Sequence, residues 1–341
     1  MNRILVVNVN WLGDVIFSSP IFKALKSAYP QAKISCLAVP RVKEILESIP
    51  EIDEIIIYDE KSKHWNPLAK LGLIAELRRK KFDIVFLLHR SWTRAFLVFL
   101  AGIPQRVGYD AKGRGVFLTH KVVPLKEPVH RRDYYLNVIE SFGVKVQDRR
   151  TRLSVDPESQ EEIQTTLSRK GIKPEDFLVV IHPGANWDLK RWPLENFARL
   201  IQQLMLAGDK KVVIPGSSKD EPLVREIISH RAMNRLRPVV LTGQTNLKQL
   251  IALMKRANLV ISSDSGPLHV ATSVGTAVIG LFGPTRPEVT GPCGVGKAVV
   301  LQKEVGCNHE PCYYLECPDN ICMQAVTVHE VMNEVAKIRL S

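Results

Sequence analysis

The chain has 341 residues, of which 45% are hydrophobic and 24% are charged, and its net charge is +12 at pH 7. This length suits two ordinary domains, and the composition is that of a globular protein, which excludes a disordered chain. The longest run without a polar side chain, Ala95 to Ile103, is far shorter than the roughly 20 residues of a membrane-spanning helix.

The N-terminal stretch MNRILVVNVNWLGD has asparagines and an aspartate where a signal peptide is apolar, so we expect a cytoplasmic location. Residues 1–155 hold 26 Lys and Arg against 15 Asp and Glu, whereas residues 156–341 hold 21 against 20. This asymmetry indicates that the first half meets an anionic partner, such as a nucleic acid, a phosphorylated glycan or a lipid headgroup surface. The alternative is ordinary solvated surface, since the basic run 78–81 also suits the end of a helix.

The first half alternates between strand-like and helix-like segments. Four runs have the length and β-branched content of strands, namely Ile4–Val9, Ile34–Ala38, Glu54–Tyr58 and Ile84–Leu88. Apolar residues with helical spacing lie between them, at 16–25 and 71–77. This order predicts a parallel, doubly wound sheet. The polar stretch 146–160 predicts a linker, with a new helix beginning near Pro157.

The second half repeats the alternation. The predicted strands are Leu178–Ile181, Lys211–Ile214, Val239–Leu241, Leu259–Ser262 and Ala277–Phe282, and the predicted helices are 193–207, 219–230, 246–256 and 267–274. An amphipathic segment, Val326 to Leu340, ends the chain. We therefore expect an α/β protein with two Rossmann-like, doubly wound parallel-sheet domains, 1–155 and 156–325, a cleft between them, and a C-terminal helix within 326–341.

Ligands of open α/β sheets bind at the carboxyl ends of the strands, and three predicted strand ends carry unusual polar residues. The first strand ends near Asn10, and Gly13 and Asp14 precede a helix. Asp14 is either a carboxylate that acts as a general base or the N-cap of that helix. Gly13 allows a ligand to approach the backbone closely.

The second polar strand end is the stretch HPGANWDLKRWP, residues 182–193. A lysine beside a glycine turn, here Lys190 after Gly184, suits a phosphate or a pyrophosphate. The alternative is a solvated loop lysine, with Trp192 and Pro193 anchoring the helix that follows.

The third polar strand end is SDSGPLH, residues 263–269. Asp264, Ser265 and Gly266 stand at the start of a helix whose exposed N–H groups favour an anion, and His269 lies one turn further on. The alternative is a capped helix with a buried, hydrogen-bonded histidine.

Several common functions lack their motifs. The G-x-G-x-x-G fingerprint of dinucleotide oxidoreductases does not follow the first strand, and GVGKA at 294–298 lacks the spacing of a P-loop. A basic nucleic-acid-binding protein would explain the charge, but no recognised nucleic-acid motif accompanies it.

The chain resembles glycosyltransferase family 9, the bacterial lipopolysaccharide heptosyltransferases. The resemblance extends over nearly the full length and rests on motifs in family order: NWLGDVIFSSP, AGIPQRVGY, HPGANWDLKRWP, PGSSKDE and SDSGPLHVATSVGTAVIGLFGPT. It implies a GT-B fold, in which the C-terminal domain binds the sugar nucleotide and the basic first domain binds the acceptor. It also implies that the C-terminal helix returns toward the first domain.

The resemblance implies an inverting transfer of heptose from ADP-heptose to the inner core of lipopolysaccharide, with Asp14 as the base and Lys190 at the donor diphosphate. The implied donor-binding residues are Gly184, Ala185, Asn186, Lys190, Asp220 or Glu221, Asp264, Ser265, Gly266 and His269. The expected acceptor-side residues are Asn10, Gly13, Lys61, Arg90, Arg94, Arg131 and Arg132.

The resemblance thus implies an enzyme whose partners are ADP-heptose and a lipid-anchored lipopolysaccharide core, with peripheral contact to the cytoplasmic face of the inner membrane. No specific nucleic acid is expected. No cofactor or metal ion is expected, since neither a DxD-like acidic pair nor a His/Asp metal cluster appears at a predicted strand end. The alternatives are a GT-B relative that uses another sugar nucleotide, for example an epimerase, and the nucleic-acid-binding protein.

Four cysteines recur every five residues, at Cys307, Cys312, Cys317 and Cys322. Structural zinc sites usually pair cysteines two to four residues apart, so this even spacing is not typical of one. The segment therefore predicts either reduced, partly buried thiols or a loop folded around a metal ion.

Overall fold

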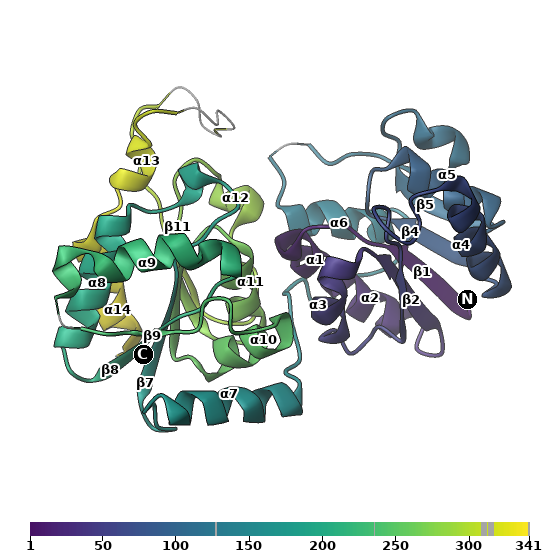
Figure 1. Cartoon of the computed structure of the whole chain (residues 1–341). Coiled ribbons are helices and arrows are strands. Elements are labelled where there is room, and N and C mark those ends of the chain that lie inside the picture. Colours follow the sequence, from purple (N-terminus) through teal and green to yellow (C-terminus); the bar gives the residue numbers. More distant parts are fainter. Residues whose placement is uncertain (127, 235, 308–311, 313–316, 340–341) are drawn as a thin grey trace. The chain divides into compact units, whose positions relative to one another are not determined.

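The computed structural model describes residues 1–126, 128–234, 236–307, 312 and 317–339. The chain divides into two compact units, Met1–Ser154 and Val155–Ser341. Each unit is built on a six-stranded parallel sheet (Figure 1).

In the first unit the strands lie in the order β3-β2-β1-β4-β5-β6. Their bounds are β1 Arg3–Val7, β2 Lys33–Ala38, β3 Glu54–Ile57, β4 Ile84–Leu87, β5 Gln105–Tyr109 and β6 His120–Val122. Ile4 on β1 is aligned with Ile34 on β2 and with Ile84 on β4. The chain first builds outward from β1 through β2 and β3, then returns and builds the other way from β4, so β1 and β4 form the switch point where such folds bind ligands.

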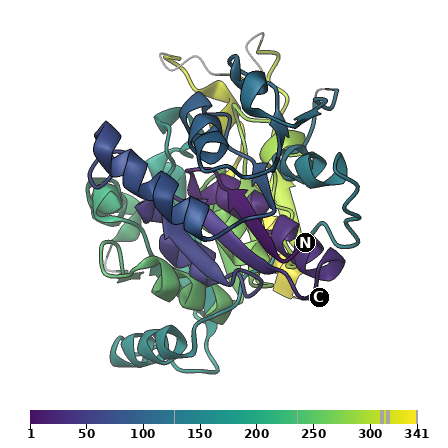
Figure 2. The ribbon, with the colours of Figure 1, turned by 90° about the vertical axis from the view of Figure 1, so that its right-hand side faces the viewer.

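Helices cover both faces of this sheet, because successive strand side chains point to opposite faces. One face packs against α4 (Pro67–Arg79) and α5 (Trp92–Leu100), and its core includes Leu5, Val85 and Leu77. In Figure 2, α4 lies in front of the sheet. The other helices are α1 Leu12–Ser18, α2 Pro20–Ala28, α3 Lys43–Glu47 and α6 Arg131–Glu140. Of these, α6 packs against α1 and α2. Short 3₁₀ helices, η1 Pro40–Val42 and η2 Arg114–Phe117, lie in the connections.

The second unit has the same topology, with strand order β12-β11-β10-β7-β8-β9. The bounds are β7 Phe177–His182, β8 Lys210–Ile214, β9 Val239–Val240, β10 Leu259–Ser263, β11 Ala277–Leu281 and β12 Ala298–Leu301. Its switch point lies between β7 and β10, where His182 is aligned with Ser262.

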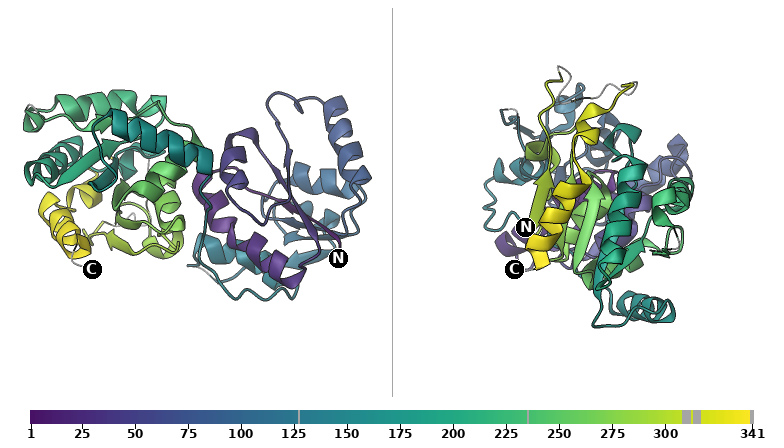
Figure 3. Two further views of the ribbon diagram at one scale, coloured as in Figure 1. Left: turned by 90° about the horizontal axis from the view of Figure 1, so that it is seen from below. Right: turned by 90° about the vertical axis from the view of Figure 1, so that its left-hand side faces the viewer.

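The helices of the second unit are α7 Pro157–Arg169, α8 Leu194–Leu206, α9 Glu221–Ser229, α10 Leu247–Arg256, α11 Gly266–Ser273, α12 Pro287–Thr290, α13 Ile321–Gln324 and α14 Val328–Arg339, with 3₁₀ helices η3 Asp188–Lys190, η4 Ser218–Asp220 and η5 Arg231–Met233. The C-terminal helix α14 lies alongside α8 (Figure 3, right). Val331 and Val335 on α14 enter the same buried core as Phe197 and Leu204 on α8.

Each predicted strand exists within two residues of its expected bounds, and α7 begins at Pro157. Three strands were not predicted, namely β5, β6 and β12, and each lies at or near an edge of its sheet. The helical pattern at 16–25 comprises two helices, because α1 ends at Ser18 and α2 begins at Pro20 after the intervening Ser19. Among the described residues no helix is both long and apolar enough to cross a membrane.

Candidate functional site

The loops at the switch point of the second unit bring Lys190, Asp264 and His269 together. Asp264 directly follows β10, and its side chain is buried. Its Oδ2 accepts a hydrogen bond from Lys190 Nζ at 2.6 Å and another from the Thr285 hydroxyl at 2.8 Å. Its Oδ1 lies 3.7 Å from His269 Nε2. The third and second polar strand ends of the sequence therefore form one cluster.

This cluster keeps Asp264 ionised. Burial alone raises the pKa of a carboxyl group, but hydrogen bonds and charges from His269 and Lys190 outweigh burial. They hold the pKa of Asp264 well below its ordinary value of 3.8. An ionised Asp264 fixes the Lys190 ammonium, which also lies over the Trp187 ring, 5.1 Å from its centroid.

Helix α11 begins directly after this cluster. Ser265 is its N-cap residue, and Gly266 and Pro267 form its first turn. The Ser265 hydroxyl lies 2.9 Å from the Ser262 hydroxyl and 3.3 Å from His182 Nδ1. Ser265 thereby ties the start of α11 to both central strands, which places the positive end of the α11 dipole beside Lys190.

A second carboxylate lies against the glycine of the loop after β7. Asp220 Oδ2 accepts hydrogen bonds from the backbone N–H and the hydroxyl of Ser217, at 2.8 and 2.7 Å. A Cβ atom on Gly184 would lie 2.5 Å from Asp220 Oδ1, so only glycine fits there without displacement. Glu221 lies similarly close to Gly243, where a Cβ would come within 2.8 Å of its Oε1.

The remaining predicted donor residues lie in the loop after β7. The Ala185 carbonyl accepts a hydrogen bond from Arg191 at 3.4 Å, and Asn186 is exposed. His182 ends β7 and is buried. Burial lowers the pKa of His182 from 6.5 to about 4, against the opposing charge of Asp220, so the ring is neutral at pH 7.

At the switch point of the first unit, the buried Arg94 links the residues that follow β1 to the loop before α4. The Arg94 guanidinium donates to the Asn8 carbonyl and to Asn10 Oδ1, both at 2.9 Å. It also pairs with Glu60 at 3.2 Å. Because Arg94 is 1% exposed, its guanidinium organises the site rather than presenting a free surface charge.

Asp14 lies in the first turn of α1, which follows β1. It does not cap the helix, because the N-cap residue is Trp11. Its Oδ1 accepts a hydrogen bond from the Tyr135 hydroxyl at 2.9 Å. Burial and the Asp14 charge raise the pKa of Tyr135 well above 10, so Tyr135 remains a donor. Gly13 is partly exposed beside Asp14.

The other predicted acceptor residues surround this switch point. Arg90 lies over the Tyr134 ring, 5.8 Å from its centroid. Arg131 and Arg132 begin α6, the helix that carries Tyr135, and Arg132 pairs with Asp133 at 2.8 Å. Lys61 is exposed next to Glu60.

The residues near these sites that were not predicted include Arg114, Tyr135 and Thr285. Arg114 is fully buried on η2 and donates to the carbonyls of Tyr109 and His89. Burial lowers the pKa of Arg114 from 12.5 to about 10, so it stays charged at pH 7. Arg114 lies shortly after the motif AGIPQRVGY, and Thr285 is the last residue of the motif SDSGPLHVATSVGTAVIGLFGPT. Tyr135 lies in neither motif and reaches Asp14 only through a tertiary contact.

Of the four evenly spaced cysteines, Cys312 is buried and the others are partly exposed. The Cys312 N–H donates to the Pro284 carbonyl, and Cys322 lies near Gly283. Within the described ranges, no three His, Cys, Asp or Glu side chains gather closely enough to hold a metal ion.

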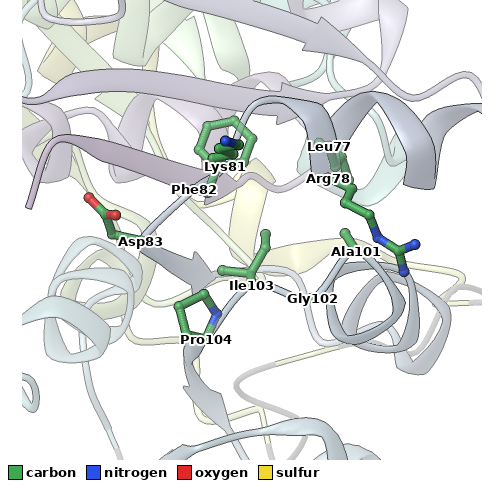
Figure 4. Close-up of a pocket in the computed structure, with 9 residues that line it drawn as sticks. All are labelled: Leu77, Arg78, Lys81, Phe82, Asp83, Ala101, Gly102, Ile103 and Pro104. Carbon is green, nitrogen blue, oxygen red and sulfur yellow. The ribbon is translucent and has the colours of Figure 1, made fainter.

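A surface cavity of about 470 Å³ lies in the first unit, lined by Leu77, Arg78, Lys81, Phe82, Asp83, Ala101, Gly102, Ile103 and Pro104 (Figure 4). It adjoins the amino end of β4, the edge opposite Asp14. Two of its polar side chains have structural partners: Asp83 accepts from the N–H groups of Asn2 and Arg3, and Arg78 donates to the Leu100 carbonyl. This cavity is therefore separate from the candidate site.

Known proteins match almost the whole chain. The family described as glycosyltransferase family 9 (heptosyltransferase) matches residues 71–317. Lipopolysaccharide heptosyltransferase 2 of Salmonella typhimurium is 29% identical over 85% of this chain and 85% of its own length. Lipopolysaccharide heptosyltransferase 3 of Escherichia coli is 32% identical over 80% of this chain and 81% of its own.

A solved structure, the E. coli ADP-heptose lps heptosyltransferase II, superimposes with a TM-score of 0.82 and 25% identity, covering 99% of this chain and 98% of that one. The two parallel α/β sheets and this match confirm the predicted GT-B fold. The family match and the curated relatives confirm the resemblance found in the sequence. The chain is a glycosyltransferase and belongs to glycosyltransferase family 9.

Proposed function

We propose that this enzyme transfers heptose from ADP-heptose to the inner core of lipopolysaccharide, with inversion at the anomeric carbon. The observation that carries the proposal is the Lys190–Asp264 pair at 2.6 Å, beside the start of α11. The names of the relatives support the choice of sugar and acceptor.

The donor diphosphate would bind at this pair. An ammonium group has three donors, so Lys190 can bind Asp264 and a diphosphate oxygen at once. The positive end of α11 adds fixed partial charge. As the bond between the sugar carbon and the diphosphate oxygen breaks, negative charge grows on the departing ADP, and these preorganised groups stabilise it. We infer that Asp264 positions Lys190 and does not touch the diphosphate itself, because its carboxylate is buried and negatively charged.

The acceptor hydroxyl would lose its proton to Asp14. The hydroxyl oxygen attacks the anomeric carbon, its proton moves to the Asp14 carboxylate, and ADP departs with the electron pair of the broken bond. Tyr135 keeps the carboxylate oriented through its hydrogen bond to Oδ1. Proton transfer of this kind contributes about 10²–10⁴ to a rate.

The acceptor is proposed to be anionic and lipid-anchored. Phosphate groups on the core would suit the excess of positive charge in residues 1–155, including Arg90 and Arg131. Contact with the cytoplasmic face of the inner membrane would then be peripheral. Because the lysine and the helix dipole supply the charge that the diphosphate needs, we propose that the reaction requires no metal ion.

The test is turnover of the purified protein with ADP-heptose and defined truncated core acceptors, followed by ADP release and by mass analysis of the product. We expect one added heptose with inverted anomeric configuration, at a rate unchanged by a chelator. Parallel reactions with UDP- and GDP-sugars test the alternative donors. Preferred use of either one would overturn the assignment of ADP-heptose.

A further inference from the structure

Helix α4 carries apolar residues on two opposite faces, although only one face packs against the protein. Leu73, Ile74 and Leu77 are buried in the core of the first unit. Leu68 and Leu71 are 78% and 56% exposed, and Trp65, just before the helix, is 69% exposed. A surface helix of a globular protein normally turns polar residues to solvent, so this outer face needs another explanation.

The fold holds the exposed face in place. Next to Trp65, the His64 side chain is buried against Tyr58, with ring centroids 5.6 Å apart, and it accepts a hydrogen bond from the Asp59 N–H at 3.1 Å. Asn66 caps the helix by accepting from the Ala69 N–H at 2.8 Å. Because both neighbours are anchored, Trp65 points outward as part of a built surface.

The same segment is strongly basic. Residues 61–81 contain seven Lys and Arg and one Glu, a net charge of +6. Lys61 and Lys63 are exposed next to Trp65, and Lys70 lies within the first turns of α4. Aromatic and aliphatic side chains surrounded by cations are typical of helices that lie in a membrane interface.

We propose that the α4 surface, formed by Lys61, Lys63, Trp65, Leu68, Lys70 and Leu71, docks on a lipid bilayer that contains anionic headgroups. The apolar side chains enter the boundary between headgroups and acyl chains, and the lysines bind headgroup phosphates. The attraction between these basic residues and an anionic surface weakens as salt is added. A protein partner is disfavoured, because the core of a protein interface is depleted in charge.

This inference deepens the proposed function, since an enzyme with a lipid-anchored acceptor gains from resting on the bilayer. Its evidence is nonetheless separate, because Trp65, Leu68 and Leu71 take no part in the proposed chemistry. The two proposals can therefore fail independently.

The test is flotation of the full-length protein with vesicles of phosphatidylcholine that contain phosphatidylglycerol as the anionic lipid. We expect binding that falls at high salt and falls at least about tenfold in the triple variant Trp65→Ser/Leu68→Ser/Leu71→Ser, because the apolar side chains that would enter the bilayer are then absent. The matched control is Leu206→Ser, at a residue 67% exposed on the second unit, which should bind as the wild type does.

Turnover separates this inference from the proposed function. The triple variant should process a delipidated core acceptor in solution at the wild-type rate, which also shows that it folds, and should lose activity on acceptor embedded in vesicles. Unchanged vesicle binding by the triple variant, or no binding by the wild type, would overturn the inference. Vesicle binding through α4 without any heptose transfer would overturn the proposed function and leave the inference standing.

Discussion

The proposed role of the Asp14 carboxylate as a base can be tested with a single substitution that keeps the shape of the side chain. Asn has the same shape as Asp but is a far weaker base. Asp14→Asn should therefore lower kcat by about 10²–10⁴ while ADP-heptose affinity stays unchanged, since the proposed donor contacts all lie on the second unit. Initial rates of ADP release and a binding titration measure the two quantities.

Tyr135→Phe tests how the base is held. The variant loses the hydroxyl that donates to Asp14 at 2.9 Å, so we expect a smaller loss of kcat, roughly tenfold for a loosened catalytic geometry. Tyr29→Phe, at the end of α2, is the control and should keep full activity. Full turnover in Asp14→Asn would remove Asp14 from the role of base.

Lys190 and Asp264 form the ion pair at which the donor diphosphate is proposed to bind. Their side chains are 17% and 4% exposed, so removing Lys190 leaves a nearly buried carboxylate without its cation. Lys190→Met should therefore destabilise the second unit by about 3 kcal/mol, the low end for a buried pair, because Lys190 keeps some contact with water. Urea unfolding measures this loss.

A double-mutant cycle separates the pair from its surroundings. Adding Asp264→Asn to Lys190→Met should restore part of the lost free energy of unfolding, because no uncompensated charge then remains buried. Both variants should still lose catalytic rate. Additive losses of stability in the double variant would contradict the geometry described for this pair.

At the scale of elements, the loop after β7 depends on a glycine that allows close packing. A Cβ on Gly184 would meet Asp220 Oδ1 at 2.5 Å, and Asp220 is already fixed by two hydrogen bonds to Ser217. Gly184→Ala should therefore cost about 1–3 kcal/mol of stability, as overpacking does, and raise the KM for the donor. Thermal unfolding and donor titration measure the two effects.

The matched glycine is Gly72 in α4, where a Cβ would meet nothing within 4 Å. Gly72→Ala should stabilise the first unit by up to about 1 kcal/mol, because alanine favours a helix. An equal effect of both substitutions would show that the space around Gly184 does not matter.

Sequence patterns predict the central strands best, because nearly all of their residues are buried inside the fold. β1, β4, β7 and β10 each contain an unbroken apolar run of at least three residues, because both of their faces are covered. In the edge strand β6, His120–Val122, only Val122 is buried and the other two residues are polar and exposed. Its sequence pattern therefore gives little indication of a strand. The break between α1 and α2 follows from Pro20, yet the apolar spacing continues across it.

Some contacts of the candidate site could likewise be expected from the sequence, and others could not. Because β7 and β10 are neighbours, polar residues after each strand must meet, and this rule alone brings Lys190 near Asp264. No such rule places Tyr135 beside Asp14, since that contact depends on how α6 packs against α1. Nor does local spacing show that Arg94 is buried by Asn8, Asn10 and Glu60.

At the scale of the whole molecule, the two units repeat one arrangement. Each has a histidine near the carboxyl end of a strand at its switch point, although the two strands do not correspond in the topology: His89 follows β4, and His182 ends β7. Burial lowers the pKa of both rings from 6.5 to about 4, and the charges of Arg94 and Arg114 add to the effect at His89. Both histidines are therefore neutral in the folded protein at pH 7.

Neutral buried histidines make stability depend on pH in a defined window. In the unfolded chain His182 titrates near 6.5, and in the folded chain near 4, so the unfolded state binds more protons between these values. The stability that His182 contributes is complete above pH 6.5 and is lost as the pH falls toward 4, by at most about 1.4 kcal/mol per pH unit. The depressed pKa of Asp264 acts only below its ordinary value of 3.8, outside this window.

Replacing His182 should remove the part of the pH dependence of stability that this histidine causes. His182→Asn should unfold in urea with a midpoint that depends less on pH between 6.5 and 4.5 than that of the wild type, even if it is less stable at pH 7. The control is His329→Asn, at an exposed position on α14, which should keep the wild-type slope. If the free energies of unfolding of His182→Asn and the wild type fall in parallel over this pH range, burial does not keep His182 neutral. The packing between the end of β7 and the start of α11 would then not determine the charge of this ring.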